Sequence, residues 1–203
     1  MKIICVGLNY RDHIEELGFS APDEPIFFLK PETALLVRNR PFFLPDFSQE
    51  IHYEVELLVR INKLGKHIQP RFAHTYYNEI GLGVDFTARD IQERLRKEGL
   101  PWEQAKSFDG SAVVSPFIPK NQFSNLSEIR FSLQKNGETV QIGNSNNMIF
   151  NIDQLISYIS QYVTLKIGDI IFTGTPVGVG PVSINDRLTG YIEDQKMFDF
   201  KIK

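Results

Sequence analysis

Short apolar runs separated by turn signals cover most of the chain. Runs rich in Val, Ile, Leu, Phe and Tyr, bounded by glycine, proline, asparagine or aspartate, are typical of β-strands. The pattern predicts strands over residues 2–7, 52–61, 80–87, 129–135, 138–143, 170–173, 186–193 and 196–203. Asn136-Gly137 separates the fourth and fifth of these runs, and this dipeptide is the strongest short signal for a hairpin.

Helical spacing is confined to three segments. Residues 152–163 carry one apolar stripe, and Asn151 with Gln154 has the form of a capping box at its start. A second helix is expected after Thr87, whose hydroxyl would cap it while Asp90 reaches back, and it would stop at Gly99.

The third helical segment, residues 10–17, is very short and is closed by Gly18. A helix of about two turns is unstable alone and must be held by tertiary contacts or by a ligand. Residues 10–18 are therefore a candidate mobile element.

Many strands with a few short helices predict an α+β, β-rich fold rather than a doubly wound sheet. The chain contains no Gly/Ser linker, no charged block and no evident internal repeat. We therefore expect one domain over residues 1–203.

Composition excludes several classes of protein. Hydrophobic residues make up 42% and charged residues 23% of 203, as in ordinary globular proteins. The net charge of −3, without a basic cluster, argues against nucleic acid as a partner. Cys5 is the single cysteine, which rules out an internal disulfide framework and a cysteine-based zinc site. No apolar stretch is long enough for a membrane span or a signal-peptide core, so we expect a cytoplasmic protein with no membrane contact.

Three acidic residues lie in strand-like apolar segments. Glu54 and Glu56 point to one face of a strand because strand side chains alternate, and a solvated face is the ordinary explanation of such a pair. Asp85 lies in a second apolar run, where an unpaired carboxylate would be costly to bury. Together the three suggest a shared cation. Oxygen ligands favour Mg²⁺, Mn²⁺ or Ca²⁺ over zinc, and three protein ligands leave positions open for water and substrate.

His13 and Glu16 stand three residues apart in the short helix, hence on one face. A histidine bonded to a carboxylate is the usual way to make a general base near neutral pH. A surface salt pair is the competing interpretation and, from this pair alone, the stronger one. His52, next to the carboxylate strand, is a candidate to support the site.

The glycine-rich segment 174–180 has neither the Gly-Lys-Ser/Thr ending of a phosphate-binding loop nor the third glycine of a dinucleotide-binding motif. We interpret it as a loop at a strand end, whose amides and Thr175 hydroxyl could hold an anionic ligand.

These motifs, taken together and in order, resemble the fumarylacetoacetate hydrolase family along nearly the whole chain. The residues that carry the resemblance are Gly7-Leu8-Asn9-Tyr10-x-x-His13, Phe28-Leu29-Lys30-Pro31, Tyr53-Glu54-Val55-Glu56-Leu57, Asp85-Phe86-Thr87-Ala88-Arg89-Asp90, Ala105-Lys106-Ser107-Phe108-Asp109 and Thr173-Gly174-Thr175-Pro176-x-Gly178-Val179-Gly180. The pattern is most similar to the short branch that includes acylpyruvate hydrolases and oxaloacetate decarboxylases or tautomerases. One difference is Leu8, where many relatives carry arginine.

The resemblance implies a mixed β-sheet roll, a homodimer, and a divalent metal, Mg²⁺ or Mn²⁺, with Ca²⁺ as a structural substitute. It places the metal on Glu54, Glu56 and Asp85. It assigns His13 and Glu16 to a lid helix that activates water, and Lys106 to catalysis. Substrate contacts are implied for four further residues: Gln92, Thr175, Arg89 and Lys30.

The reaction expected from this resemblance is C–C hydrolysis of acylpyruvates, decarboxylation of oxaloacetate, or keto–enol tautomerisation, each through an enolate stabilised beside the metal. Two alternatives stay open. One is an isomerase or decarboxylase of 2-hydroxyhepta-2,4-diene-1,7-dioate from aromatic catabolism. The other is a keto-acid-binding domain without activity.

Overall fold

The computed structural model describes residues 1–16, 20–37 and 39–203, without the side chains of Glu16 and Val37. Within these residues the strands form one large mixed sheet, one four-stranded sheet and one small three-stranded sheet. The α+β, β-rich prediction is confirmed.

In the large sheet, β1 (Ile3–Gly7) runs parallel to β12 (Ile170–Phe172) and antiparallel to the edge strand β2 (Ile26–Lys30). Its strands follow the order β2 (Ile26–Lys30), β1 (Ile3–Gly7), β12 (Ile170–Phe172), β5 (Val55–Ile61), β6 (Tyr77–Asp85), β8 (Ala112–Val114) and β3 (Leu35–Val37), with β9 (Ile118–Pro119) on β6. β3 and β8 are parallel as well, which makes the sheet mixed. Its central strands are buried on both faces, as their continuous apolar sequence requires.

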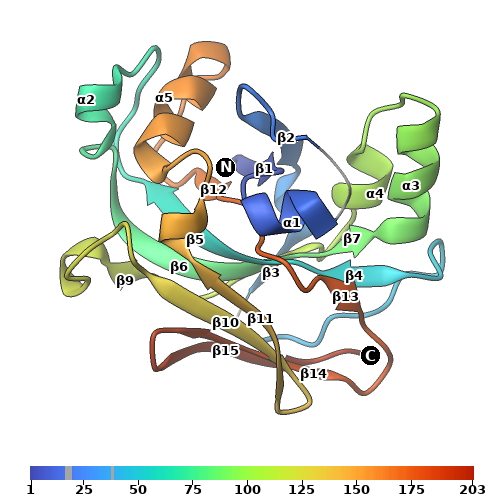
Figure 1. Cartoon of the computed structure of the whole chain (residues 1–203). Helices are drawn as coiled ribbons and strands as arrows, with labels where there is room; N and C mark the ends of the chain where they lie inside the picture. Colours follow the sequence, from blue (N-terminus) through green and yellow to red (C-terminus); the bar gives the residue numbers. More distant parts are fainter. Residues whose placement is uncertain (17–19, 38) are drawn as a thin grey trace.

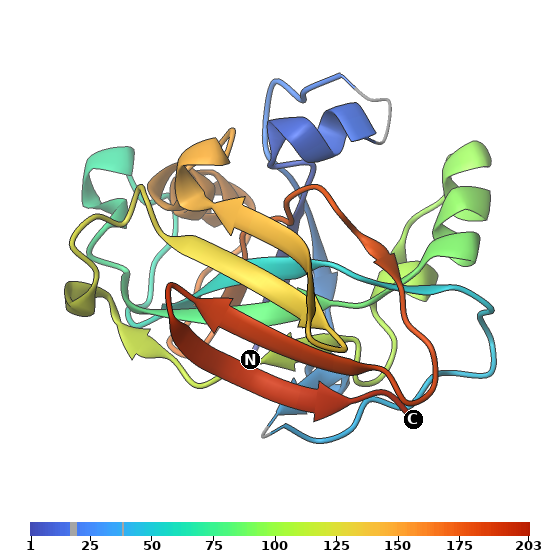
Figure 2. The ribbon, with the colours of Figure 1, turned by 60° about the horizontal axis from the view of Figure 1, so that its bottom comes forward.

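The four-stranded sheet lies beneath the large one in Figure 1 and comes to the front in Figure 2. Its order is β11 (Glu138–Asn144), β10 (Arg130–Lys135), β14 (Arg187–Ile192) and β15 (Gln195–Lys201). Phe131, Leu133, Leu188 and Phe198 are buried in the core that it shares with the large sheet. The Asn136-Gly137 hairpin is confirmed, and both residues have the positive φ that its tight turn requires.

The small sheet joins β13 (Gly180–Pro181), β4 (Ile51–Tyr53) and β7 (Thr87–Ala88). It interrupts two of the predicted strands. The run predicted over 52–61 divides at Glu54 into β4 and β5, and the run predicted over 80–87 divides after Asp85 into β6 and β7. Both breaks fall at the acidic residues.

The helices lie on the opposite side of the large sheet from the four-stranded sheet (Figure 1). They are α1 (Arg11–Glu16), α2 (Pro70–Ala73), α3 (Arg89–Lys97), α4 (Glu103–Lys106) and α5 (Ile152–Tyr162), with 3-10 turns at Glu32–Ala34, Lys120–Gln122 and Ser145–Asn147. α5 has the predicted capping box, with both Asn151–Gln154 hydrogen bonds present. No helix of the described residues is long and apolar enough to cross a membrane.

Two helix predictions need correction or restriction. Thr87 does not cap α3: the residue before the helix is Ala88, the Thr87 hydroxyl bonds the Asp85 carbonyl, and Asp90 bonds Ser48. Thr87 belongs instead to β7, because pairing with β4 outweighs the local capping preference. α1 confirms a short helix at residues 11–16. The helical segment was expected to continue to residue 17 and to be closed by Gly18, but residues 17 and 18 lie outside the described part.

Gly83 allows β6 to pack between its neighbours. A Cβ there would lie 2.5 Å from the Val113 carbonyl oxygen and 2.8 Å from the Phe172 ring. At Gly81 the nearest atoms belong to the half-buried Phe117 ring, at 3.0 Å, which can move.

We expect Gly83→Ala to lower the free energy of unfolding by about 2 kcal/mol or more, because the added methyl presses on backbone in a packed core. The matched substitution Gly81→Ala should cost less than about 1 kcal/mol, since a side chain can yield. Urea unfolding measures both, and equal losses would contradict the assigned role of Gly83.

Candidate active site

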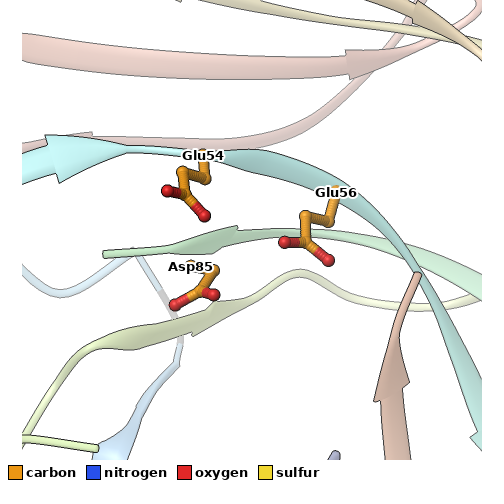
Figure 3. A group of neighbouring side chains, drawn as sticks. All are labelled: Glu54, Glu56 and Asp85. Atoms are coloured by element: carbon orange, nitrogen blue, oxygen red, sulfur yellow. The ribbon is translucent and has the colours of Figure 1, made fainter. Parts of the chain in front are cut away.

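Three carboxylates converge where β4, β5 and β6 meet. Glu54 falls in the break between β4 and β5, Glu56 lies in β5, and Asp85 ends β6. The Asp85 amide donates to the Glu54 carbonyl at 2.8 Å, which places the two residues opposite each other. Figure 3 shows the three side chains pointing into one space. Each offers an oxygen within 4.8 Å of the others, and their exposed fractions are 6%, 2% and 1%.

Buried cationic side chains compensate two of the three carboxylates. Lys106 Nζ, at the end of α4, lies 2.7 Å from Glu54 Oε2 and 2.8 Å from Asp85 Oδ2. Arg89, at the start of α3, donates from Nη2 to Glu54 Oε1 at 2.5 Å. Lys30 Nζ lies 2.5 Å from Asp85 Oδ1.

Glu56 differs from the other two carboxylates. Among the ion pairs of the described residues it has no cationic partner; instead it accepts a hydrogen bond from the Gly174 amide at 2.6 Å. The predicted anion-holding loop therefore binds a carboxylate of the protein itself. Gly174 has φ +101°, and a Cβ there would lie 2.7 Å from the Asn9 Cβ, so glycine is required.

The pKa values of Glu54 and Glu56 reflect this difference in their partners. Burial alone would raise the pKa of Glu54, but the Lys106 and Arg89 charges outweigh it and hold the pKa below its ordinary value. Burial, with the Asp85 and Glu54 charges, raises the pKa of Glu56 well above its ordinary value. Burial opposes the charge of Lys106, yet Asp85 and Glu54 raise its pKa.

The three carboxylates, Lys106 and Arg89 line a cavity of about 210 Å³. Of the predicted site residues, it is lined by His13, Glu54, Glu56, Asp85, Arg89, Gln92, Lys106 and Thr175. His13 reaches it from α1 and is 5% exposed. The side chain of Glu16 lies outside the described part, so the His13–Glu16 pair stays a prediction.

Arg89, Gln92 and Lys30 have partners within the protein. Arg89 also donates from Nη1 to Gln92 Oε1 at 2.5 Å and from Nε to His52 Nδ1 at 3.4 Å. His52 therefore contacts the site through Arg89, as expected of a residue that supports it. Lys30 is not among the described residues that line the cavity, and its ammonium also bonds the Ser111 carbonyl at 3.0 Å. The structure therefore places Lys30 against Asp85 rather than in the cavity wall.

The cavity also has an apolar part of its lining, which was not predicted from the sequence. This part of the lining includes Leu8, Ile26, Phe28 and Trp102, and Arg96 also lines the cavity. The centroid of the Phe28 ring lies 5.4 Å from Lys106 Nζ, next to the charged groups. Phe28 and Trp102 pack edge to face with ring centroids 6.2 Å apart. Leu8 has φ 54°, an uncommon conformation for a leucine. No sequence pattern joins these residues, because they come from separate elements.

Gln141 is a further residue that the sequence did not indicate. It is 1% exposed and contacts both the carboxylate strand and the Thr175 loop. Alternation in β11 suggested the reverse orientation, since Val140 and Ile142 flank it, yet Ile142 is 70% exposed.

Comparison with known proteins agrees with this architecture over the whole chain. Residues 2–202 match the family described as "Fumarylacetoacetate (FAA) hydrolase C-terminal". The chain is 43% identical over 202 residues to mouse "Oxaloacetate tautomerase FAHD1, mitochondrial", covering 100% of this chain and 91% of that protein. It is 42% identical over 189 residues to Escherichia coli "Oxaloacetate tautomerase YcgM", covering 93% of this chain and 86% of that protein. The crystal structure of fumarylpyruvate hydrolase from Pseudomonas aeruginosa with Mn²⁺ and pyruvate superposes with a TM-score of 0.94 at 35% identity. The match covers 100% of this chain and 89% of that chain.

We expect Lys106→Met to lower the free energy of unfolding of the metal-free protein by about 3–5 kcal/mol, because it leaves two buried carboxylates short of a counter-charge. Lys196→Met is the matched control. Lys196 is 55% exposed and 3.6 Å from Asp199, and its loss should cost less than about 1 kcal/mol. Similar losses in urea unfolding would contradict the ion-pair account of the site.

Proposed function

Because the chain belongs to the fumarylacetoacetate hydrolase family, we propose that it is a divalent-metal-dependent enzyme acting on β-dicarbonyl α-keto acids. The reaction is acylpyruvate C–C hydrolysis, oxaloacetate decarboxylation or keto–enol tautomerisation. The observation that carries this proposal is the buried Glu54–Glu56–Asp85 cluster, which opens into a cavity beside Lys106 and His13.

The three carboxylates fit a divalent cation. Their oxygens are close enough to share one ion, and oxygen ligands of this kind suit Mg²⁺ or Mn²⁺. Glu56, buried without a cationic side chain among the described ion pairs, is the group that such an ion would compensate. When bound, the metal supplies Lewis acidity toward the carboxylate and 2-oxo oxygens of an α-keto acid.

The neighbouring side chains have complementary roles. Lys106 places a fixed positive charge beside the oxygen on which an enolate develops, and its ion pairs hold it charged. Gln92 and the Thr175 hydroxyl bond the substrate oxygens. Arg89 keeps Glu54 oriented through its contacts to Glu54, Gln92 and His52.

His13 is the proton carrier in this proposal. In hydrolysis it takes a proton from water, with Glu16 holding its ring, and the hydroxide attacks the distal carbonyl of an acylpyruvate. The C–C bond then breaks, its electron pair forms the enolate of pyruvate, and a proton returns to carbon. α1 acts as the lid that brings His13 to the substrate.

The other two reactions use the same enolate without attack by water. Oxaloacetate loses CO₂, and the electron pair of the broken C–C bond forms the enolate. Tautomerisation moves one proton between carbon and oxygen. The apolar side chains of the cavity lining, Leu8 among them, suit a short acyl tail, while the names of the mouse and E. coli relatives favour oxaloacetate.

Turnover of oxaloacetate and acetylpyruvate, side by side, tests the proposal. We expect chelator-treated protein to be inactive and added Mg²⁺ or Mn²⁺ to restore loss of at least one substrate. The ratio of the two rates separates decarboxylase from hydrolase, and faster keto–enol exchange of oxaloacetate without pyruvate formation identifies a tautomerase. A metal-loaded protein inactive in all three assays would contradict the proposal and favour the dienoate isomerase. The homodimer implied by the resemblance is a separate proposal, which light scattering tests.

Glu56→Gln tests whether Glu56 binds the metal and whether turnover depends on that binding. The new amide oxygen can still accept from the Gly174 amide, and the substitution removes a buried charge that lacks a cationic partner among the described ion pairs. We expect Mn²⁺ affinity to fall about 100-fold or more and turnover to fall with it, because a charged ligand is lost, while the metal-free protein keeps its melting temperature. Calorimetric titration with Mn²⁺ measures the affinity. The substitution Glu128→Gln, at an exposed position, is the control, and Mn²⁺ binding by Glu56→Gln as tight as that of the original protein would overturn the ligand assignment.

His13→Gln separates the reactions. We expect acetylpyruvate hydrolysis to fall about 100-fold or more, the usual contribution of a general base, and oxaloacetate decarboxylation to fall less than about tenfold. Steady-state kinetics on both substrates make the comparison. Equal losses would show that His13 has no role specific to water activation.

A further inference from the structure

Gln141 is a buried amide that joins the two halves of the candidate site. It comes from β11, an edge strand of the four-stranded sheet. Glu56 and Asp85 lie on strands of the large sheet, and Glu54 lies where the large and the small sheet join. Its Oε1 accepts from the Val55 amide at 2.9 Å, and its Nε2 donates to Thr175 Oγ1 and to the Pro176 carbonyl, both at 2.9 Å. Val55 is the residue between Glu54 and Glu56.

A β-bulge directs Gln141 inward. In the β10–β11 pair, Leu133 faces Gln141 and Gln134 faces Thr139, so Val140 is the extra residue. A bulge re-aims the neighbouring side chains, which explains why the polar Gln141 is buried while the apolar Ile142 is exposed. The inward position is therefore occupied by the amide of Gln141 rather than by an apolar side chain.

The orientation of this amide is fixed by its backbone partners. A backbone N–H can only donate and a carbonyl can only accept, so Val55 requires Oε1 and Pro176 requires Nε2. It follows that Nε2 is the atom that faces Thr175, and the Thr175 hydroxyl oxygen must accept from it. The hydroxyl proton of Thr175 consequently points away from Gln141.

We infer that Gln141 is a positioning residue that turns the Thr175 hydroxyl into a hydrogen-bond donor toward the cavity. Thr175 lines the cavity and is 4% exposed, so its proton serves an acceptor on the ligand, namely the carboxylate of an α-keto acid. Through Val55, the same amide fixes the distance from this donor to the carboxylate cluster. The inference rests on the proposed function for the identity of the ligand.

Gln141→Glu tests this role. The new carboxylate can still accept from Val55, but it offers no amide donor and takes the Thr175 proton for itself. We expect the dissociation constant of pyruvate, measured by calorimetry on Mn²⁺-loaded protein, to rise about tenfold, as loss of a hydrogen bond to a charged group predicts. KM for the turned-over substrate should rise by a similar factor, kcat should change less than about threefold, and Mn²⁺ affinity should stay the same.

A double-mutant cycle with Thr175→Val separates this mechanism from simple charge repulsion. If Gln141 acts through the hydroxyl, Gln141→Glu should change pyruvate affinity less than about twofold once residue 175 is valine. A tenfold loss in both backgrounds, or no loss in either, would overturn the inference.

Thr175 gives an independent test should Gln141→Glu fail to fold. Thr175→Val should weaken pyruvate binding about tenfold, and Thr175→Ser, which keeps the hydroxyl, should stay within about twofold of the original protein. Equal affinities in all three would overturn the inference. An original protein that binds Mn²⁺ but neither binds pyruvate nor turns over keto acids would overturn the proposed function as well.

Discussion

Burial of three like charges at the junction of β4, β5 and β6 is the constraint on which the rest of the site depends. Carboxylates held this close, out of water, repel one another and lose hydration, so the protein must surround them with compensating groups. Lys106, Arg89 and Lys30 come from three separate elements to do so, and the Gly174 amide serves Glu56. The large sheet supplies the rigid frame, because Gly83 lets β8 approach β6 beside the cluster.

Glu56, which has no cationic partner among the ion pairs of the described residues, connects structure with function. Glu54 and Asp85 each have cationic partners, whereas Glu56 accepts a hydrogen bond from the Gly174 amide and has a raised pKa. A divalent cation would relieve that imbalance, and in doing so would present open positions to the cavity. In the proposed function, one such site serves hydrolysis, decarboxylation and tautomerisation, because these reactions differ in the bond that breaks and share an enolate, which Lys106 would face.

Local patterns predicted what depends on local chemistry. The Asn136-Gly137 hairpin, the Asn151–Gln154 capping box and most strands follow from residues close in sequence. The carboxylate cluster was also predictable, because carboxylates in apolar strands are costly to bury unless a cation compensates them. Features set by tertiary pairing were not predictable: the strand break at Glu54, the loss of the Thr87 cap to β7, the apolar part of the cavity lining, and the inward Gln141. In β11 the bulge reverses the alternation that the sequence suggests, so no local pattern could have revealed it.

The most direct test of the central claim is to locate Mn²⁺ by anomalous diffraction in crystals soaked with the ion, with and without pyruvate. The account predicts one strong peak within bonding distance of Glu54, Glu56 and Asp85, and pyruvate oxygens on its open side when pyruvate is present. Mn²⁺ found only at exposed carboxylates, with this cluster empty at saturating ion, would contradict it.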